Sequence, residues 1–156
     1  MSLELSTAGV LLKYACETSA GTRPTVNYTT IPNIKSIPDF NPEPESLEVT
    51  DLSDTEWRRY IPGLKDPGGA LSFTANLTTG FKTAWANMMS AVSTAAATNK
   101  ATWFEIMVPN FGSFYFAGIP SNLGMTAMDV NSVLEIEAYI TPNKIHGWDT
   151  SSTVSA

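Results

Sequence analysis

The sequence predicts a mainly β fold with one helix. Several stretches alternate apolar and polar residues with the period of a half-buried strand, whereas one stretch repeats apolar residues at helical spacing. The chain has 156 residues and is 43% hydrophobic, so it is long enough to bury a core as a single domain. We therefore expect strands before and after one amphipathic helix.

Three strands are expected before the helix. The first is Gly9–Glu17, and a connector follows in which Thr, Asn, Tyr and Pro recur. The second is Ser46–Leu52, which alternates as a half-buried strand does. The third is Ala70–Leu77, with two distinct faces. Its apolar face holds Leu71, Phe73, Ala75 and Leu77, and its polar face holds Ser72, Thr74 and Asn76.

Helical spacing replaces the alternation after residue 78. Large apolar residues recur at i, i+4, i+7, i+8 and i+11, which forms one stripe along a helix. These residues are Phe81, Trp85, Met88, Met89 and Val92. Thr78 or Thr79 can cap the N-terminus, and Asn99 suits the C-terminal cap. We expect the stripe to pack against a sheet as part of the core.

The last third of the chain returns to strands. Thr102–Val108 and Ser113–Ile119 form an expected hairpin around a short turn that contains Pro109 and Gly112. A further strand is expected at Ser132–Thr141, with Leu134, Ile136, Ala138 and Ile140 on one face. The tail from Pro142 has no periodicity, so we expect it to stay mobile until a partner holds it.

A long acidic segment stands out between the second and third strands. Seven acids lie between Asp39 and Glu56, with no Lys or Arg among them. Large aromatic and basic residues follow, and then a turn rich in Pro and Gly. We expect a long loop at 51–69, and loops of this length are usually functional or disordered. Either its aromatic residues contact another molecule, or Trp57 and Tyr60 fold back onto their own domain.

Composition argues against several classes of protein. Charged residues make up 15% of the chain, against about 25% in ordinary soluble domains, which suits a surface covered by neighbours. The net charge of −6 argues against nucleic-acid binding. Cys16 is the single cysteine, so no internal disulfide is expected. The sequence shows neither a membrane anchor nor a secretion signal, so we expect synthesis in a cytoplasm.

Candidate catalytic and metal-binding groups are weak. His146 is the single histidine and has no Cys, Asp or Glu at metal spacing, so a surface or interface role is expected. Asp51, Asp54 and Glu56 resemble a paired-carboxylate site only superficially, because acids at this spacing are common in loops. The same stretch lacks the glycine of a calcium loop, and no G-x-S-x-G motif is present. We expect no enzyme activity and no cofactor.

The order of these elements resembles a known family, the major tail tube proteins of long-tailed, non-contractile (siphophage-type) bacteriophages. The segments that carry the resemblance are EPESLEVTDLSD, WRRYIPGLKDPGG, ALSFTANLT, WFEIMVPNFGSFYFAGI and SVLEIEAYIT. They cover a core at about residues 8–141, which leaves an N-terminal arm at 1–7 and a C-terminal tail at 142–156. The resemblance implies a β-sandwich or barrel flanked by the helix, in a structural protein of the virion tail.

The resemblance also implies how copies associate. Such proteins form hexameric rings that stack into a hollow tube, through which DNA passes without specific binding. The implied partners are further copies of the chain and the tape measure, tail tip and tail terminator proteins. An acidic or neutral wall suits the bore, because basic residues would hold phosphates. The residues expected to face the lumen are Glu48, Thr50, Ser72, Thr74, Asn76, Glu135 and Glu137.

The loop at 51–69 is the expected contact between stacked rings. Aromatic and large apolar residues are typical anchors of interfaces, and two arginines are available to pair with acids on the adjacent ring. The residues of this loop are Asp51, Asp54, Trp57, Arg58, Arg59, Tyr60, Ile61 and Leu64. Alternatively, the polar faces are only the wet side of a half-exposed sheet. Two alternative functions remain: a monomeric β-sandwich binding module that uses the 51–69 loop, and another ring-forming tube of a contractile tail or a secretion-type system.

Overall fold

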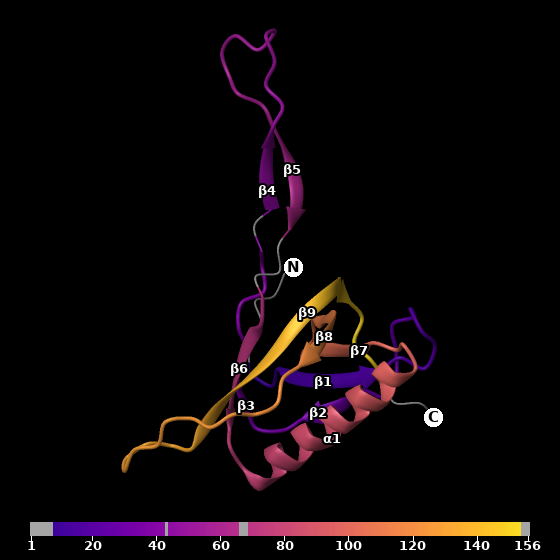
Figure 1. Cartoon of the computed structure of the whole chain (residues 1–156), viewed down its shortest axis with the longest axis vertical. Coiled ribbons are helices and arrows are strands. Elements are labelled where there is room, and N and C mark those ends of the chain that lie inside the picture. The colour runs from indigo at the N-terminus through magenta and orange to yellow at the C-terminus, as the bar shows by residue number, and fades with distance from the viewer. Residues whose placement is uncertain (1–7, 43, 66–68, 154–156) are drawn as a thin grey trace. The chain divides into compact units, whose positions relative to one another are not determined.

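The computed structural model describes residues 8–42, 44–65 and 69–153. The chain divides into two compact units (Figure 1). The body comprises the described residues up to Pro38 and from Ala70 onward, and the arm is Asp39–Gly69. Among the described residues there is one helix, and the other regular elements are strands. The predicted fold class, mainly β with a single helix, is therefore confirmed.

The body contains a seven-stranded antiparallel sheet in the order β2-β1-β7-β8-β9-β6-β3. Its strands are β1 (Leu11–Cys16), β2 (Thr29–Ile31), β3 (Ile34–Ser36), β6 (Leu71–Asn76), β7 (Thr102–Val108), β8 (Gly112–Pro120) and β9 (Glu135–Asp149). The two edge strands β2 and β3 follow each other in the chain, and Asn33 has a positive φ of 63° in the turn between them. A sheet whose first and last strands are joined by a tight turn is close to a closed barrel.

The helix α1 (Thr79–Ala97) begins and ends at local signals. The Thr78 hydroxyl accepts a hydrogen bond of 3.1 Å from the Phe81 N–H, which caps the first turn. At the other end Asn99 has a φ of 58°, and the Lys100 N–H donates to the Ala95 carbonyl at 2.9 Å. This pairing is a Schellman motif in which Thr98 is the C-cap and Asn99 takes the left-handed position just after it, so the predicted Thr78 cap is confirmed and Asn99 lies one residue beyond the C-cap.

The core lies on both faces of the body sheet. In β7, Trp103 and Phe104 are neighbours and point to opposite faces, yet both are buried. Phe104 stacks on Phe116 with ring centroids 5.4 Å apart, whereas Trp103 packs with Tyr115. The helix lies beside β1 and β2 (Figure 1) and buries Phe81, Trp85 and Met88 of the predicted stripe, while Met89 and Val92 are half-buried.

The arm is a hairpin of β4 (Pro44–Glu48) and β5 (Tyr60–Lys65). The prediction of one long loop at 51–69 is therefore wrong, because β5 occupies part of that range. Pro62 and Gly63 lie within β5, and both residue types weaken a strand signal. The second predicted strand, Ser46–Leu52, was expected to be half-buried, but Leu47 and Val49 are exposed. The alternation there belongs to a hairpin without a buried face.

The last strand continues well past the predicted end at Thr141. β9 pairs with β8 as far as Asp149, so the prediction of a mobile tail from Pro142 is wrong for the described part of that tail. Two register shifts interrupt the pairing, next to Gly118 and next to Tyr115. Each shift inserts an extra residue into β9 and reverses the order of faces, which removes the alternation that a sequence pattern needs.

Candidate functional site

The tip of the arm is held together by its own polar groups. The Arg59 guanidinium donates to Asp54 Oδ2 at 2.8 Å and to Asp51 Oδ2 at 3.3 Å. Asp51 Oδ1 accepts the Ser53 N–H at 2.8 Å, and Asp54 Oδ2 accepts the Asp51 N–H at 3.0 Å. The Ser53 hydrogen bonds lower the pKa of Asp51, and the Asp51 N–H and Arg59 lower the pKa of Asp54. Both acids are therefore ionised acceptors at neutral pH.

The two arginines of the arm differ in their partners. Within the single chain, the partners of Arg59 lie in its own loop, and its pairing with acids of another copy stays a prediction. Arg58 makes no hydrogen bond or ion pair with any residue that the structure describes, and it is exposed. Arg58 is thus available to a partner, whereas Arg59 orders the tip.

The large apolar residues of the arm point into solvent. Leu52 is fully exposed, Leu64 is 90% exposed and Trp57 is 81% exposed, and about half of Tyr60 and of Ile61 is exposed as well. Within the arm itself, Trp57 has no buried surroundings. Exposed aromatic and aliphatic groups on an ordered hairpin are typical of interaction surfaces.

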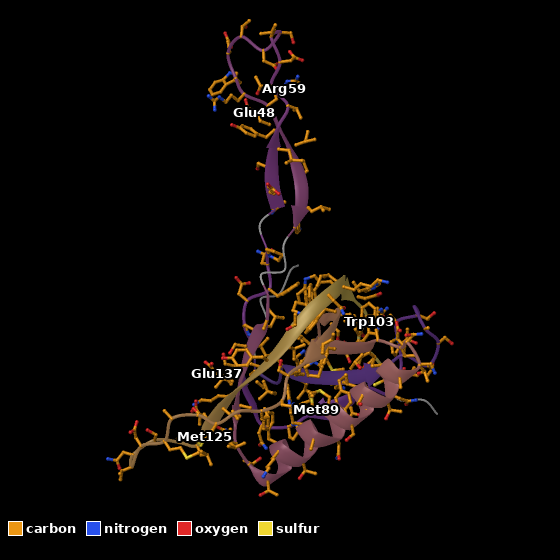
Figure 2. All side chains as sticks on the ribbon, viewed as in Figure 1. Glu48, Arg59, Met89, Trp103, Met125 and Glu137 are labelled. Atoms are coloured by element: carbon orange, nitrogen blue, oxygen red, sulfur yellow. The ribbon has the colours of Figure 1, made fainter. Side chains whose placement is uncertain are left out.

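Five of the seven residues expected to line a lumen come together on the body. Strands β6 and β9 pair so that Thr74 lies opposite Glu137 and Asn76 lies opposite Glu135, with Ser72 farther along the same face. The remaining two, Glu48 and Thr50, belong to the arm. Figure 2 shows Glu48 on the arm and Glu137 on the body. The alternation in the sequence identified a polar face in each strand but not the sheet to which it belongs.

A basic residue joins this polar face from a distant segment. Lys35 of β3 forms an ion pair with Glu135, although the face was expected to hold no Lys or Arg. Tyr139 donates its hydroxyl to Glu137 Oε2 at 2.8 Å on the same face, which raises the pKa of the Tyr139 phenol. Residues of the 121–134 loop, among them Met125, border a hollow of about 370 Å³ beside Glu137. This face therefore carries Lys35, which is paired with Glu135, and the carboxylate of Glu137.

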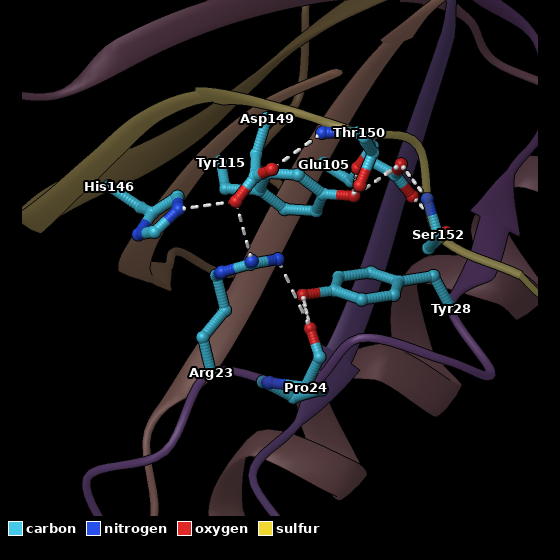
Figure 3. Close-up of polar contacts among 9 residues, drawn as sticks. All are labelled: Arg23, Pro24, Tyr28, Glu105, Tyr115, His146, Asp149, Thr150 and Ser152. Atoms are coloured by element: carbon cyan, nitrogen blue, oxygen red, sulfur yellow. Dashed lines mark hydrogen bonds and ion pairs between the residues drawn. The ribbon is translucent and has the colours of Figure 1, made fainter. Parts of the chain in front are cut away.

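A buried acid of β7, on the same face of the sheet as Glu137 by strand register, was not found from the sequence. Glu105 of β7 is 0% exposed and accepts hydrogen bonds from the Ser152 N–H at 2.9 Å and from the Tyr115 hydroxyl at 3.0 Å (Figure 3). Burial alone would raise its pKa, but hydrogen bonds from Ser113, Ser152 and Tyr115 outweigh burial and lower the pKa. Burial and the Glu105 charge raise the pKa of Tyr115 to about 12.

Further polar contacts bind the last described residues to this face. Arg23 donates to Asp149 Oδ2 at 3.0 Å and lies 4.2 Å from the centre of the Tyr115 ring. His146 Nε2 lies 2.9 Å from the same Asp149 oxygen (Figure 3), so the exposed histidine expected at the surface takes part in this contact. Val26 bridges to Thr153. The cluster holds two chain segments on the sheet and shows no arrangement for nucleophilic catalysis.

The described residues contain no group of three or more His, Cys, Asp or Glu side chains that is able to hold a metal ion. Within the same residues, the helix does not meet the length and hydropathy needed to cross a membrane. The remaining features are an ordered hairpin with exposed apolar groups and a polar face on a barrel-like sheet.

Comparisons with solved structures show where this fold recurs. A chain of the anti-feeding prophage baseplate, described as 6-fold symmetrised, has a TM-score of 0.61 at 11% identity, over 94% of this chain and 97% of that chain. A chain from the tail of an empty gene transfer agent particle, refined with C6 symmetry, has a TM-score of 0.57 at 13% identity, over 96% and 100%. A chain of the anti-feeding prophage cap has a TM-score of 0.54 at 12% identity, over 97% and 95%.

The sequence itself was compared in two ways. The search of curated proteins found no match to the chain. The model of the phage tail tube protein family matches residues 9–145, which is most of the sequence and extends from before β1 into β9, with the arm between them. The chain therefore belongs to the phage tail tube proteins, which are structural components of the virion tail rather than enzymes.

Proposed function

We propose that copies of this chain form hexameric rings, and that these rings stack into the tube through which phage DNA passes into the host. The observation that carries the proposal is the match to the tail tube family over residues 9–145. Six-fold symmetry is supported by the anti-feeding prophage baseplate, which is 6-fold symmetrised, and by the gene transfer agent tail, which has C6 symmetry. Both contain chains with this fold. The chain would be made in the host cytoplasm and act in the virion.

The polar face of β6 and β9 is our proposed wall of the bore. It presents Ser72, Thr74, Asn76 and Glu137, and its one lysine is already paired with Glu135. Unpaired basic groups would hold a passing polyanion through phosphate contacts, whereas neither strand carries a Lys or Arg where β6 pairs with β9, at Leu71–Asn76 and Glu135–Ile140. With six copies the formal charge is roughly −36 per ring, which favours passage without binding.

The arm is our proposed contact between rings. It is an ordered hairpin whose tip is held by Arg59, and it exposes Leu52 and Trp57. Tyr60, Ile61 and Leu64 extend this contact along β5, and Arg58 is free to pair with an acid of the neighbouring ring. Because the tip is ordered before contact, stacking would cost little additional conformational entropy at this site.

Other tail proteins would meet the ends of the tube. We include the tape measure protein inside the bore, and tail tip and tail terminator proteins at the two ends. A tube-terminating cap protein of the anti-feeding prophage has the same fold, which supports the idea that a terminator can continue the same packing. No membrane anchor takes part in this proposal.

Negative-stain electron microscopy of the purified, concentrated chain tests the proposal. We expect hollow tubes or six-membered rings, together with early elution from a size-exclusion column at the same concentration. A chain that stays near 17 kDa at every concentration, even after purified tail-tip proteins are added, would overturn it. Rings of another symmetry would overturn the six-fold assignment, but the proposal of a tube would still stand.

A further inference from the structure

The arm lacks a core of its own. None of its described residues is buried, although it carries Leu52, Trp57, Ile61 and Leu64. An isolated two-stranded hairpin is marginally stable at best in water, and it needs a further strand or another surface for its apolar groups. The exposed apolar side chains therefore call for a complementary surface elsewhere.

The body offers such a surface at the end of its sheet. A hollow of about 620 Å³ lies between β3, β7 and the residues just before β1. Its apolar lining consists of Val10, Ile34, Ile37, Ile106 and Val108. Each of these side chains is only half-buried, so the hollow keeps apolar surface in contact with water. Its volume lies within the range of about 300–1,000 Å³ that ligand pockets have, which suffices for an indole ring.

The charges of the two units favour their association. The arm sequence holds eight of the fifteen acids but only three of the nine basic residues, so it carries five of the six net negative charges. The rest of the chain is nearly neutral, and Lys35 lies in the lining of the hollow. Glu56 is next to Trp57, is exposed and has no partner among the described residues. An acidic apolar tip is therefore complementary to an apolar hollow with a lysine at its rim.

We propose that this hollow receives the arm tip of a second copy of the chain, with Trp57 and Leu52 inserted between Ile37 and Ile106. The inference rests on the proposed tube, because a tube places copies of the chain against one another. It goes further in naming the receiving residues. The same contact would bring Glu56 of one copy near Lys35 of the other, which would then exchange its partner Glu135 for an acid of the arm.

Disulfide trapping between two differently tagged chains tests the contact. Both carry Cys16→Ser to remove the native thiol; one carries Trp57→Cys and the other Ile37→Cys. The control replaces Ile37→Cys by Ser93→Cys, which lies on the exposed side of the helix. After mixing, assembly and mild oxidation, we expect at least about tenfold more cross-linked heterodimer in the first mixture, because residues held in contact have a high effective concentration. Equal yields would overturn the inference.

The outcomes separate this inference from the proposed tube. If the native chain forms no tubes even with tail-tip proteins added, the proposed function fails. Tubes of the substituted chains without a selective cross-link overturn only the proposed contact at the hollow. If Trp57→Cys itself prevents assembly, Leu52→Cys takes its place and leaves the indole intact. A chain that carries both Trp57→Cys and Ile37→Cys supplies the last comparison. A disulfide within that chain at high dilution would show that the arm occupies its own hollow, and would overturn the contact between copies.

Discussion

The body and the arm place their apolar residues in opposite ways. In the body, neighbouring residues of β7 are buried on both faces of one sheet, against the helix on one side and the N- and C-terminal segments on the other. In the arm, the leucines and the tryptophan are exposed on a hairpin that is held by backbone pairing and by the polar contacts at its tip. The stability of the single chain therefore resides in the body, and the exposed apolar residues of the arm agree with its proposed role in contacts between copies.

Truncating one core residue and one arm residue tests this division most directly. We expect Phe104→Ala to lower the free energy of unfolding by about 3–5 kcal/mol, because it removes a fully buried ring that stacks on Phe116. Leu52→Ala should change it by less than about 0.5 kcal/mol, because that side chain is fully exposed. Urea denaturation of the unassembled chains measures both. Similar losses in the two variants would mean that the arm contributes to the folded core.

The buried acid Glu105 tests how much polar contacts contribute to the stability of the body. We expect Glu105→Gln to lower the free energy of unfolding by about 1.5–3 kcal/mol, because a charged acceptor of three side-chain and backbone donors is lost. The folded-state pKa of Glu105 lies below its unfolded value of 4.5. Its contribution is therefore present above that value and is lost as the pH falls through the folded pKa.

The pH dependence supplies the matched measurement for Glu105. Denaturation between about pH 7 and pH 3 should show a steeper loss of stability in the native chain than in Glu105→Gln. Glu137→Gln is the control, because that carboxylate is exposed, whereas Glu105 is buried. Parallel curves for the native chain and Glu105→Gln would contradict the assignment of an ionised, hydrogen-bonded acid.

A close backbone approach in the body gives a smaller effect. A Cβ at Gly118 would lie 2.8 Å from the Thr141 carbonyl oxygen, at one of the two register shifts in β9. We expect Gly118→Ala to cost about 1–3 kcal/mol, because the strands must move apart. Gly124→Ala is the control, since nothing lies within 4 Å of the Cβ there. Thermal unfolding followed by circular dichroism compares them, and equal midpoints would show that the strands adjust freely.

Local signals in the sequence predicted much of the body. The caps of α1 and the alternation of β6 depend on residues close together in the chain, so they were visible without the fold. Strands β2 and β3 were missed because three residues cannot show a period, and the end of β9 was missed because its bulges reverse the alternation. Such elements are specified by their partners in the sheet, which a local pattern does not contain.

The candidate site was predicted less completely for the same reason. Residues that share a face within one strand were grouped correctly, as Thr74 and Asn76 were, whereas Glu48 was assigned to the same surface but lies on the arm. Lys35 joins Glu135 across 100 positions of sequence, and Glu105 meets Ser152 across 47. Contacts of this kind arise from topology, so only the folded chain reveals them.

The two arginines of the arm give the smallest effect on stability and the clearest distinction within the tip. Each substitution to alanine should change the free energy of unfolding by less than about 1 kcal/mol, because exposed ion pairs contribute little. Arg59→Ala removes the contacts with Asp51 and Asp54 and should loosen the tip, which fast hydrogen exchange at residues 49–59 would report. Arg58→Ala should leave that exchange unchanged, because the Arg58 side chain makes no hydrogen bond or ion pair with a described residue. Both variants should nevertheless raise the concentration at which tubes form. Unchanged exchange in Arg59→Ala would mean that the backbone hairpin alone orders the tip, and its ion pairs would then have no part in preparing the arm for contact.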